Sequence, residues 1–165
     1  MMSRSVKRNA IGPLLAVALI GILAAFAAGC GGDDGDEGGT EEATTEEFTD
    51  ADVTATIEIE MKEFAFIPKD ASGPAGIDEI VTPNIGQVEH ELELFKSDVD
   101  PGSLTVEPEE DKADTSPLGE EILETFAEPG QTDSAIADLK PGKYAMICNV
   151  AGHYAAGMWG NLTIK

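Results

Sequence analysis

The sequence predicts an all-β domain with a sandwich or barrel architecture. Short segments alternate apolar and polar residues, which is the pattern of half-buried strands. Three segments alternate most clearly: 53–62, 90–95 and 160–165, and the first continues as an apolar strand pattern to Pro68. Residues 69–76 are expected as turns, and 120–126 as either a short strand or a short helix. Pro-Gly pairs at 129–130 and 141–142 provide turns between such segments. Strands do not alternate with long helical patterns, so the sequence argues against a doubly wound α/β fold.

The amino terminus predicts export from the cytoplasm. Positively charged residues precede an apolar stretch over 11–28, which ends in small residues directly before Cys30. This order resembles a bacterial lipoprotein signal, which implies a signal peptide over 1–29 and a lipidated Cys30. The acyl chains would attach the protein to the outer face of the cell membrane, in the periplasm or on the cell-wall side. An uncleaved signal anchor, or cleavage elsewhere that leaves Cys30 free, stays open, and both also place the domain outside the cytoplasm.

Residues 30–52 are rich in Gly, Asp, Glu and Thr and predict a flexible acidic linker. The folded domain is expected over 53–165. The whole chain carries a formal net charge of -22. This excess of acids excludes nucleic-acid binding, which needs Lys and Arg, and it favours basic partners.

Four candidate metal ligands lie in the predicted domain. Cys148, His153 and Met158 follow one another with the spacing C-x4-H-x4-M. The chain has only two histidines, and the other one, His90, lies at the start of a predicted strand. Thiolate and thioether sulfurs suit Cu(I), imidazole suits both oxidation states, and two His, one Cys and a weak Met form the blue-copper ligand set. The sequence therefore predicts one type 1 copper ion held by these four residues.

Three other uses of these residues compete with copper. A disulfide between Cys148 and Cys30 would leave the histidines unexplained. A zinc site would favour a harder fourth ligand than Met158. A metal-free β-sandwich binding module is the remaining alternative.

The ligand loop and two further motifs resemble the cupredoxin family, which includes plastocyanin, azurin, rusticyanin and sulfocyanin. The motifs are N-x-G-x-x-x-H, from Asn84 through Gly86 to His90, and the segment 139–144 before the cysteine. The loop length is most similar to rusticyanin and sulfocyanin. This resemblance implies a Greek-key β-sandwich with copper at one end, with His90 supplied by an upstream strand and the other three ligands by the carboxyl-terminal loop.

Residues beside the ligands have two interpretations each. Asn84 and Asn149 either hydrogen-bond across the site and orient the ligands or serve ordinary turns. Tyr154 and Trp159, with the alanines at 155 and 156, either form an apolar docking rim around His153 or belong to the core. The acidic excursion over 97–120 either steers a basic partner or is a solvated loop.

The expected function is one-electron transfer, not catalysis. A multicopper enzyme needs more histidines than this chain has. The partners are expected to be redox proteins such as cytochromes or a terminal oxidase. The alternative is an extracytoplasmic copper carrier or buffer that delivers the ion rather than electrons.

Overall fold

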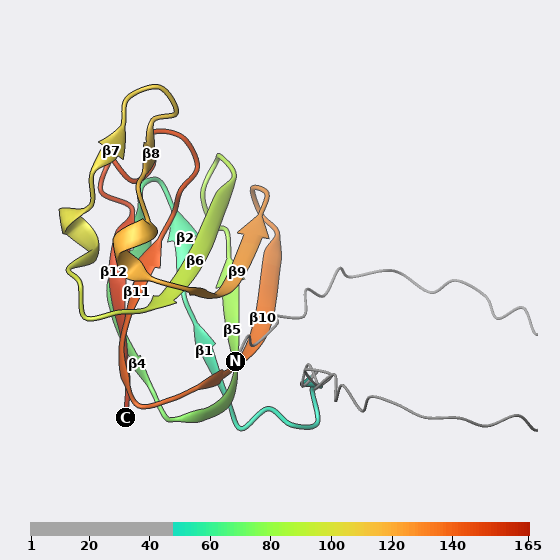
Figure 1. The fold of residues 1–165 in the computed structure, drawn as a ribbon. Helices are drawn as coiled ribbons and strands as arrows, with labels where there is room; N and C mark the ends of the chain where they lie inside the picture. Colours follow the sequence, from blue (N-terminus) through green and yellow to red (C-terminus); the bar gives the residue numbers. More distant parts are fainter. Residues whose placement is uncertain (1–47) are drawn as a thin grey trace, which may run out of the picture. The chain divides into compact units, whose positions relative to one another are not determined.

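Two β-sheets pack face to face in the computed structural model, which describes residues 48–165 (Figure 1). The three-stranded sheet has the strand order β1 (Ala55–Glu58), β5 (Gly76–Pro83) and β10 (Thr132–Leu139). The five-stranded sheet has the order β4 (Asp70–Gly73), β12 (Trp159–Ile164), β11 (Gly142–Ile147), β6 (His90–Lys96) and β9 (Glu121–Ala127). The predicted signal peptide, Cys30 and most of the predicted linker lie outside the described residues. No helix in the described part of the chain is both long and apolar enough to cross a membrane.

The order of the strands confirms the predicted sandwich. Neighbours in each sheet are mostly not neighbours in sequence, as in a Greek key: β11 pairs antiparallel with β6, and β12 pairs in parallel with β4. In the other sheet, β5 pairs in parallel with β1 and antiparallel with β10. The segment 120–126, which sequence periodicity left open between strand and helix, is strand β9.

The main core lies between the two sheets. Alternate residues of each strand point inward, so that in β6 His90, Leu92 and Leu94 are buried while the glutamates between them are only half-buried. The largest side chains that are fully buried in the described residues are apolar: Phe66, Ile59, Met61, Ile80, Leu92, Leu94, Leu123, Leu139, Met146, Ile147, Met158 and Leu162.

Two local predictions differ from the structure. The segment 53–62 is divided at Ile59 into β1 and β2 (Glu60–Lys62), although Ile59 N still donates to Val81 O (2.9 Å) and Met61 forms a parallel bridge with Asn84. β2 then pairs with β3 (Ala65–Ile67) across a tight turn. The segment 69–76, expected as turns, contains strand β4, which forms at the sheet edge because β12 supplies its hydrogen-bonding partner.

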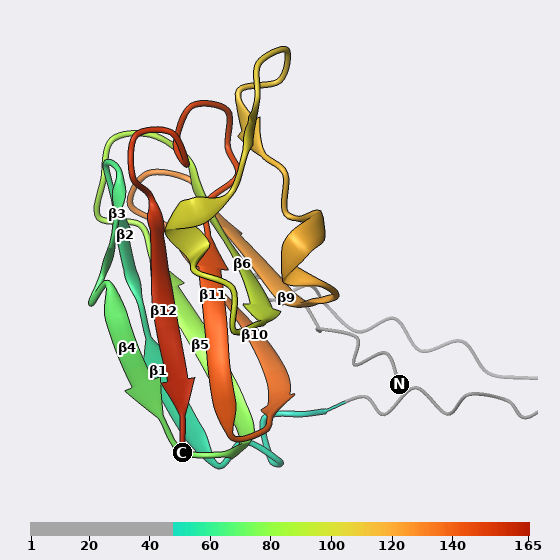
Figure 2. The same cartoon turned by 60° about the vertical axis from the view of Figure 1, so that its left-hand side comes forward.

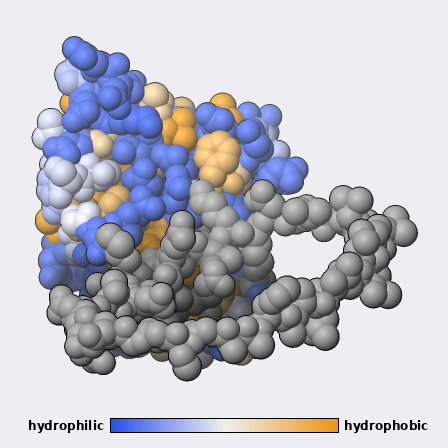
Figure 3. All heavy atoms as spheres, turned by 45° about the vertical axis from the view of Figure 1, so that its right-hand side comes forward, coloured by the Kyte–Doolittle hydropathy of each residue, from blue (hydrophilic) through white to orange (hydrophobic). Residues whose placement is uncertain are grey.

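The acidic excursion over 97–120 is folded against the outer face of the five-stranded sheet (Figure 2). It consists of two 3-10 turns, η1 (Pro101–Ser103) and η2 (Ser116–Leu118), and a short hairpin, β7 (Val106–Glu107) and β8 (Lys112–Ala113). Its buried apolar residues form a second core with side chains of β6, β11 and the ligand loop. This second core contains Phe95, Leu104, Ala113, Leu118, Ala145, Ile147 and Tyr154. The hairpin tip projects beyond the sandwich, and its surface is almost entirely hydrophilic (Figure 3).

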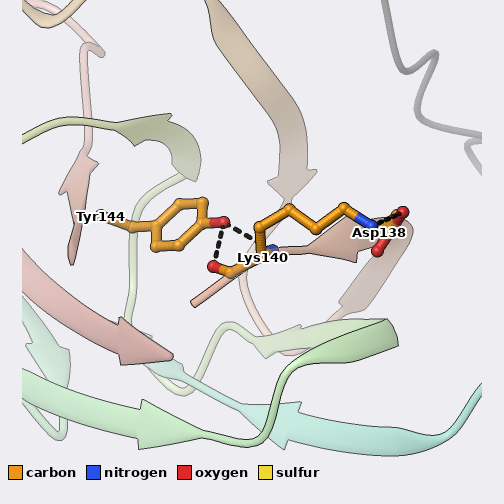
Figure 4. A network of polar contacts seen from close by, with 3 residues as sticks. All are labelled: Asp138, Lys140 and Tyr144. Atoms are coloured by element: carbon orange, nitrogen blue, oxygen red, sulfur yellow. Dashed lines mark hydrogen bonds and ion pairs between the residues drawn. The ribbon is translucent and has the colours of Figure 1, made fainter. Parts of the chain in front are cut away.

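A tyrosine fixes the turn that leads into β11 (Figure 4). The hydroxyl of Tyr144 donates a hydrogen bond to Lys140 O (2.8 Å) and accepts one from Lys140 N (3.0 Å), while the ammonium of Lys140 pairs with Asp138. These contacts close the connection between β10 and β11. The register of β11, which ends one residue before Cys148, is thereby anchored at its start.

Candidate metal centre

The antiparallel pairing of β6 and β11 brings two predicted ligands to one end of the sandwich. His90 is the first residue of β6, and Cys148 follows the last residue of β11. In the register, Glu93 lies opposite Ile147, so the start of one strand is beside the end of the other. The loop from Cys148 to Met158 then covers this end before β12 begins (Figures 1 and 2).

Three donor atoms converge at this point. Nδ1 of His90 lies 3.2 Å from Nδ1 of His153, and Sγ of Cys148 lies 3.3 Å from the same His153 nitrogen. The ligand atoms of all three residues lie within 4.8 Å of one another. His90 and Cys148 are fully buried, and His153 is 8 % exposed. A histidine 63 residues upstream in sequence is thus a direct neighbour of the carboxyl-terminal loop.

Backbone hydrogen bonds fold the ligand loop into consecutive tight turns. His153 N donates to Val150 O (2.9 Å) and Ala156 N to Gly152 O (3.0 Å). Gly152 and Gly157 have φ angles of 82° and 105°, which side chains disfavour. The glycines between the ligands therefore allow turns tight enough to point His153 back at Cys148.

Met158 is held beside the other ligands through its backbone. Its N–H donates to His153 O (3.0 Å), and its carbonyl accepts from Cys148 N (3.1 Å). The side chain is fully buried and belongs to the main core. Its axial role toward the metal stays a prediction.

Burial sets the protonation of the three converging groups. It lowers the pKa of both imidazoles, and for His90 the neighbouring His153 lowers it further. Burial raises the pKa of the Cys148 thiol to about 12, although hydrogen bonds from the backbones of Glu91 and Val150 oppose this rise. Without a metal, the site therefore holds neutral imidazoles and a neutral thiol, and metal binding must release the thiol proton.

The geometry and the chemistry of the donors fit a copper ion. Cys148 is a free, buried cysteine, and two imidazole nitrogens and one sulfur face the same point. Separations of 3.2 and 3.3 Å are those expected of donors that each lie about 2 Å from a common ion. Nε2 of His90 is buried without a hydrogen-bond partner in the described chain. The polar contact of this ring is therefore made by Nδ1, which faces His153. Two nitrogens with a thiolate are the trigonal donor set of blue copper.

Asn84 holds the loop that delivers His90. Its side-chain amide donates to Val88 O (2.7 Å) and Ala127 O (2.8 Å), and its oxygen accepts from Gly86 N (2.9 Å). The side chain is buried and fixes the path of the chain over 84–89. These bonds fit the turn interpretation of Asn84: its side chain bonds to residues of the loop and to Ala127, and through that loop it supports the strand that carries His90.

Asn149 directly follows Cys148, and its side chain bonds to the excursion, not to any of the proposed metal ligands. Its oxygen accepts from Ala113 N (2.7 Å) and its amide donates to Ala113 O (3.2 Å). The next contact between the same elements is Gly152 N donating to Asp111 O (2.7 Å). The β7–β8 hairpin thus braces the ligand loop from the side.

Tyr154 does not lie on an exposed rim, which corrects one of its two interpretations. Its ring is buried in the second core, and its hydroxyl accepts from Leu104 N (2.9 Å) and donates to Pro101 O (2.9 Å). Trp159 is half-buried against the same core, with Nζ of Lys69 3.3 Å from its ring centroid. Both aromatic residues attach the excursion to the sandwich.

The aromatic neighbour of His153 is one that sequence reasoning missed. Phe64, in the turn between β2 and β3, packs edge-on against the His153 ring with 5.0 Å between centroids and is still 41 % exposed. The segment 53–68 reads as continuous strand, which hid this turn. The two loops near this ring also expose apolar side chains. The loop that leads to His90 exposes Ile85 and Val88, and the segment after His153 exposes the alanines at 155 and 156.

Comparison with known proteins gives one family and a set of similar folds. The sequence model of the family described as "Copper binding proteins, plastocyanin/azurin family" matches residues 52–165. The structure is similar to auracyanin B (TM-score 0.55, 23 % identity), with 68 % of this chain and 90 % of that chain covered. It is also similar to dithionite-reduced auracyanin from the photosynthetic bacterium Roseiflexus castenholzii (TM-score 0.52, 24 % identity, 68 % and 98 % covered). At these identities the two structures support the fold alone. A comparison with curated protein sequences gives no significant match.

Proposed function

The chain belongs to the plastocyanin/azurin family of copper-binding proteins, and we propose that it carries single electrons between redox proteins through one type 1 copper ion. The observation that carries this proposal is the buried convergence of His90, Cys148 and His153 at one end of the sandwich. Bound copper would supply a one-electron couple between Cu(I) and Cu(II). The speed of electron transfer would depend on how rigidly the protein holds that ion.

The ligand residues would hold copper in one geometry for both oxidation states. His90, Cys148 and His153 are the three strong donors, and Met158 is proposed as the weak axial donor. The loop turns, the Asn84 amide and the hairpin contact at Asn149 fix the ligand-bearing segments from three sides. A braced site changes little on electron transfer, and this favours fast exchange.

Burial of the donors favours electron transfer over delivery of the ion. A copper carrier needs a ligand set that a recipient can reach, whereas His90 and Cys148 have no exposed surface. Electron transfer needs only that a ligand of the copper comes close to the partner at the protein surface. His153, which is partly exposed, can provide this contact. We propose that electrons leave and enter there.

The surroundings of His153 support a partner with an apolar contact patch and basic residues around it. Phe64 and the exposed alanines of the ligand loop offer apolar area, and the loops beside them carry Glu63, Glu89 and Asp111. Complementary charge would steer such a partner toward the patch. Cytochromes or a terminal oxidase are the proposed class of partner.

We further propose that the protein acts outside the cytoplasm, attached to the membrane through a lipidated Cys30. The support is the order of charged, apolar and small residues before that cysteine. In cells, Cys30→Ser is expected to move the chain from the membrane fraction to the soluble extracytoplasmic fraction. An unchanged distribution would contradict the anchor and leave the copper site untouched.

The function is tested with the purified full chain loaded with Cu(II). We expect an intense thiolate-to-copper absorption band in the visible range, a reversible one-electron wave in voltammetry, and loss of the band in Cys148→Ser. A colourless or irreversible protein would contradict the proposal. Rapid loss of copper to a modest chelator, with poor electron exchange, would instead support the copper carrier.

A further inference from the structure

A carboxylate outside the ligand set is bonded to the loop that delivers His90. Glu63 lies in the turn between β2 and β3, and its Oε1 accepts hydrogen bonds from the backbone N–H of Gln87 and of Val88 (3.2 Å). The loop lies about two dozen residues further along the chain. The glutamate therefore adds a side-chain connection to the backbone bond from Ile85 N to Met61 O (2.9 Å), which joins β2 to the start of the same loop.

The loop approaches this carboxylate closely because it has a glycine there. A Cβ on Gly86 would lie 2.7 Å from Oε1 of Glu63 and 3.1 Å from its Cδ. On its other side, the same loop is bonded to the buried Asn84 amide. The segment before His90 is thus held from inside by Asn84 and from outside by Glu63.

The same two-residue turn also reaches the second histidine. Phe64, which follows Glu63, packs against the ring of His153. The Glu63 carboxylate therefore lies beside the loop that leads to His90 and one residue from the side chain that contacts His153. Hydrogen bonds, first of all from Gln87, lower the pKa of Glu63 itself, so the group is an anion at neutral pH.

We propose that Glu63 is a positioning residue that fixes the His90 loop and lowers the reduction potential of the copper centre. The proposal rests on the proposed function and extends it. A negative charge near both histidines stabilises the more positively charged Cu(II) state relative to Cu(I). Because Glu63 is exposed, added salt screens part of this effect, and the potential of the wild type is expected to rise with ionic strength.

Two substitutions separate the charge from the hydrogen bonds. Glu63→Gln keeps an acceptor oxygen and removes the charge, whereas Glu63→Ala removes both. The matched control is Glu58→Gln on β1, which removes one exposed carboxylate five residues away, roughly 16 Å along an extended chain. This is beyond the Debye length of about 8 Å at physiological salt.

The first readout is the reduction potential of the copper-loaded full chain. We expect Glu63→Gln to favour Cu(I) three- to tenfold over the wild type, which is about 28 to 59 mV for a one-electron couple. The control is expected to stay within the error of the wild type. A blue, reversible wild type with an unchanged potential in Glu63→Gln overturns the inference alone, whereas a wild type without a blue centre overturns the proposed function and the inference with it.

The second readout needs no copper. Amide hydrogen exchange in the metal-free full chain is expected to accelerate at Gln87 and Val88 at least tenfold in Glu63→Ala, less in Glu63→Gln, and not in Glu58→Gln. Unchanged exchange at both amides in Glu63→Ala would overturn the positioning role.

Discussion

The side-chain amide of Asn149 satisfies both backbone groups of Ala113, accepting from its N–H at 2.7 Å and donating to its carbonyl at 3.2 Å. These two bonds join the residue after Cys148 to strand β8 of the excursion. The excursion is therefore part of the structure that holds the metal loop.

Replacing Asn149 by Ala should destabilise the protein and loosen its hold on copper. The change leaves two buried backbone groups of Ala113 without partners, which costs about 1–3 kcal/mol of unfolding free energy. Urea unfolding measures this loss, and a chelator competition measures the expected faster release of copper. Asn161→Ala is the control, because its bond to Asp70 (2.8 Å) is exposed and worth about 1 kcal/mol or less. Equal effects of the two substitutions would contradict a bracing role for the hairpin.

Glu93 should make the stability of the protein fall as pH rises from acidic to neutral. Burial, followed by repulsion from Glu91, Glu121 and Glu124, raises its pKa from 4.5 to about 7, and Lys112 only partly offsets this. Below pH 4.5 the carboxyl group is protonated in both the folded and the unfolded state, so its burial does not lower the free energy of unfolding. Between pH 4.5 and 7 the folded state retains a proton that the unfolded state has lost, so stability falls through this window.

The full shift corresponds to about 3 kcal/mol, and partial solvent exposure reduces the expected loss to about 1–2 kcal/mol. Glu93→Gln should remove this part of the pH dependence and stabilise the protein at pH 7, as measured by urea unfolding of the metal-free chain at several pH values. Glu58→Gln, on the other sheet, serves as the control. A Glu93→Gln variant with the same pH profile as the wild type would show that the carboxyl group is not held in its protonated form.

Met158→Leu should keep the copper and raise its reduction potential. Leucine fills a similar buried volume, and such exchanges usually cost less than about 1.5 kcal/mol. Loss of the weak axial sulfur favours Cu(I), and we expect at least a tenfold bias, about 59 mV. Voltammetry of the loaded chain measures this shift. A fall in potential, or a variant that no longer binds copper, would contradict the axial role.

Phe64→Ala should slow electron exchange while leaving the copper spectrum nearly unchanged. The ring packs against His153 and contributes exposed apolar area at the proposed contact patch. Its removal is expected to slow self-exchange between two copies of the protein several-fold, measured by NMR line broadening of mixed oxidised and reduced samples. Ile67→Ala, a change of similar exposure on β3, should leave the rate within twofold of the wild type. Equal rates in all three proteins would remove Phe64 from the electron path.

The ligand set could be predicted from sequence because few residues carry its chemistry. The chain has only two histidines, and the spacing of Cys148, His153 and Met158 fits a tight loop between two strands. The strands themselves followed from period-two alternation. Both features are local in sequence, and the antiparallel pairing of β6 with β11 then brings His90 to the loop.

Other parts of the site depend on contacts that local sequence does not encode. Strand β4 has a turn-like composition and is a strand only because β12 lies beside it. The excursion reads as solvated because its apolar residues are sparse, yet Leu104 and Leu118 are buried in a second core. Tyr154 reads from sequence as rim or as core, and its burial in the second core and the bonds of its hydroxyl to the excursion decide between them.

Two imidazoles and one thiolate are proposed to bind the same copper ion. X-ray absorption at the copper edge of the loaded full chain tests this directly. We expect one short sulfur and two nitrogen scatterers at about 2.0–2.3 Å, with the sulfur lost in Cys148→Ser and one nitrogen altered in His90→Gly. A spectrum with only oxygen and nitrogen scatterers, or one that Cys148→Ser leaves unchanged, would contradict it.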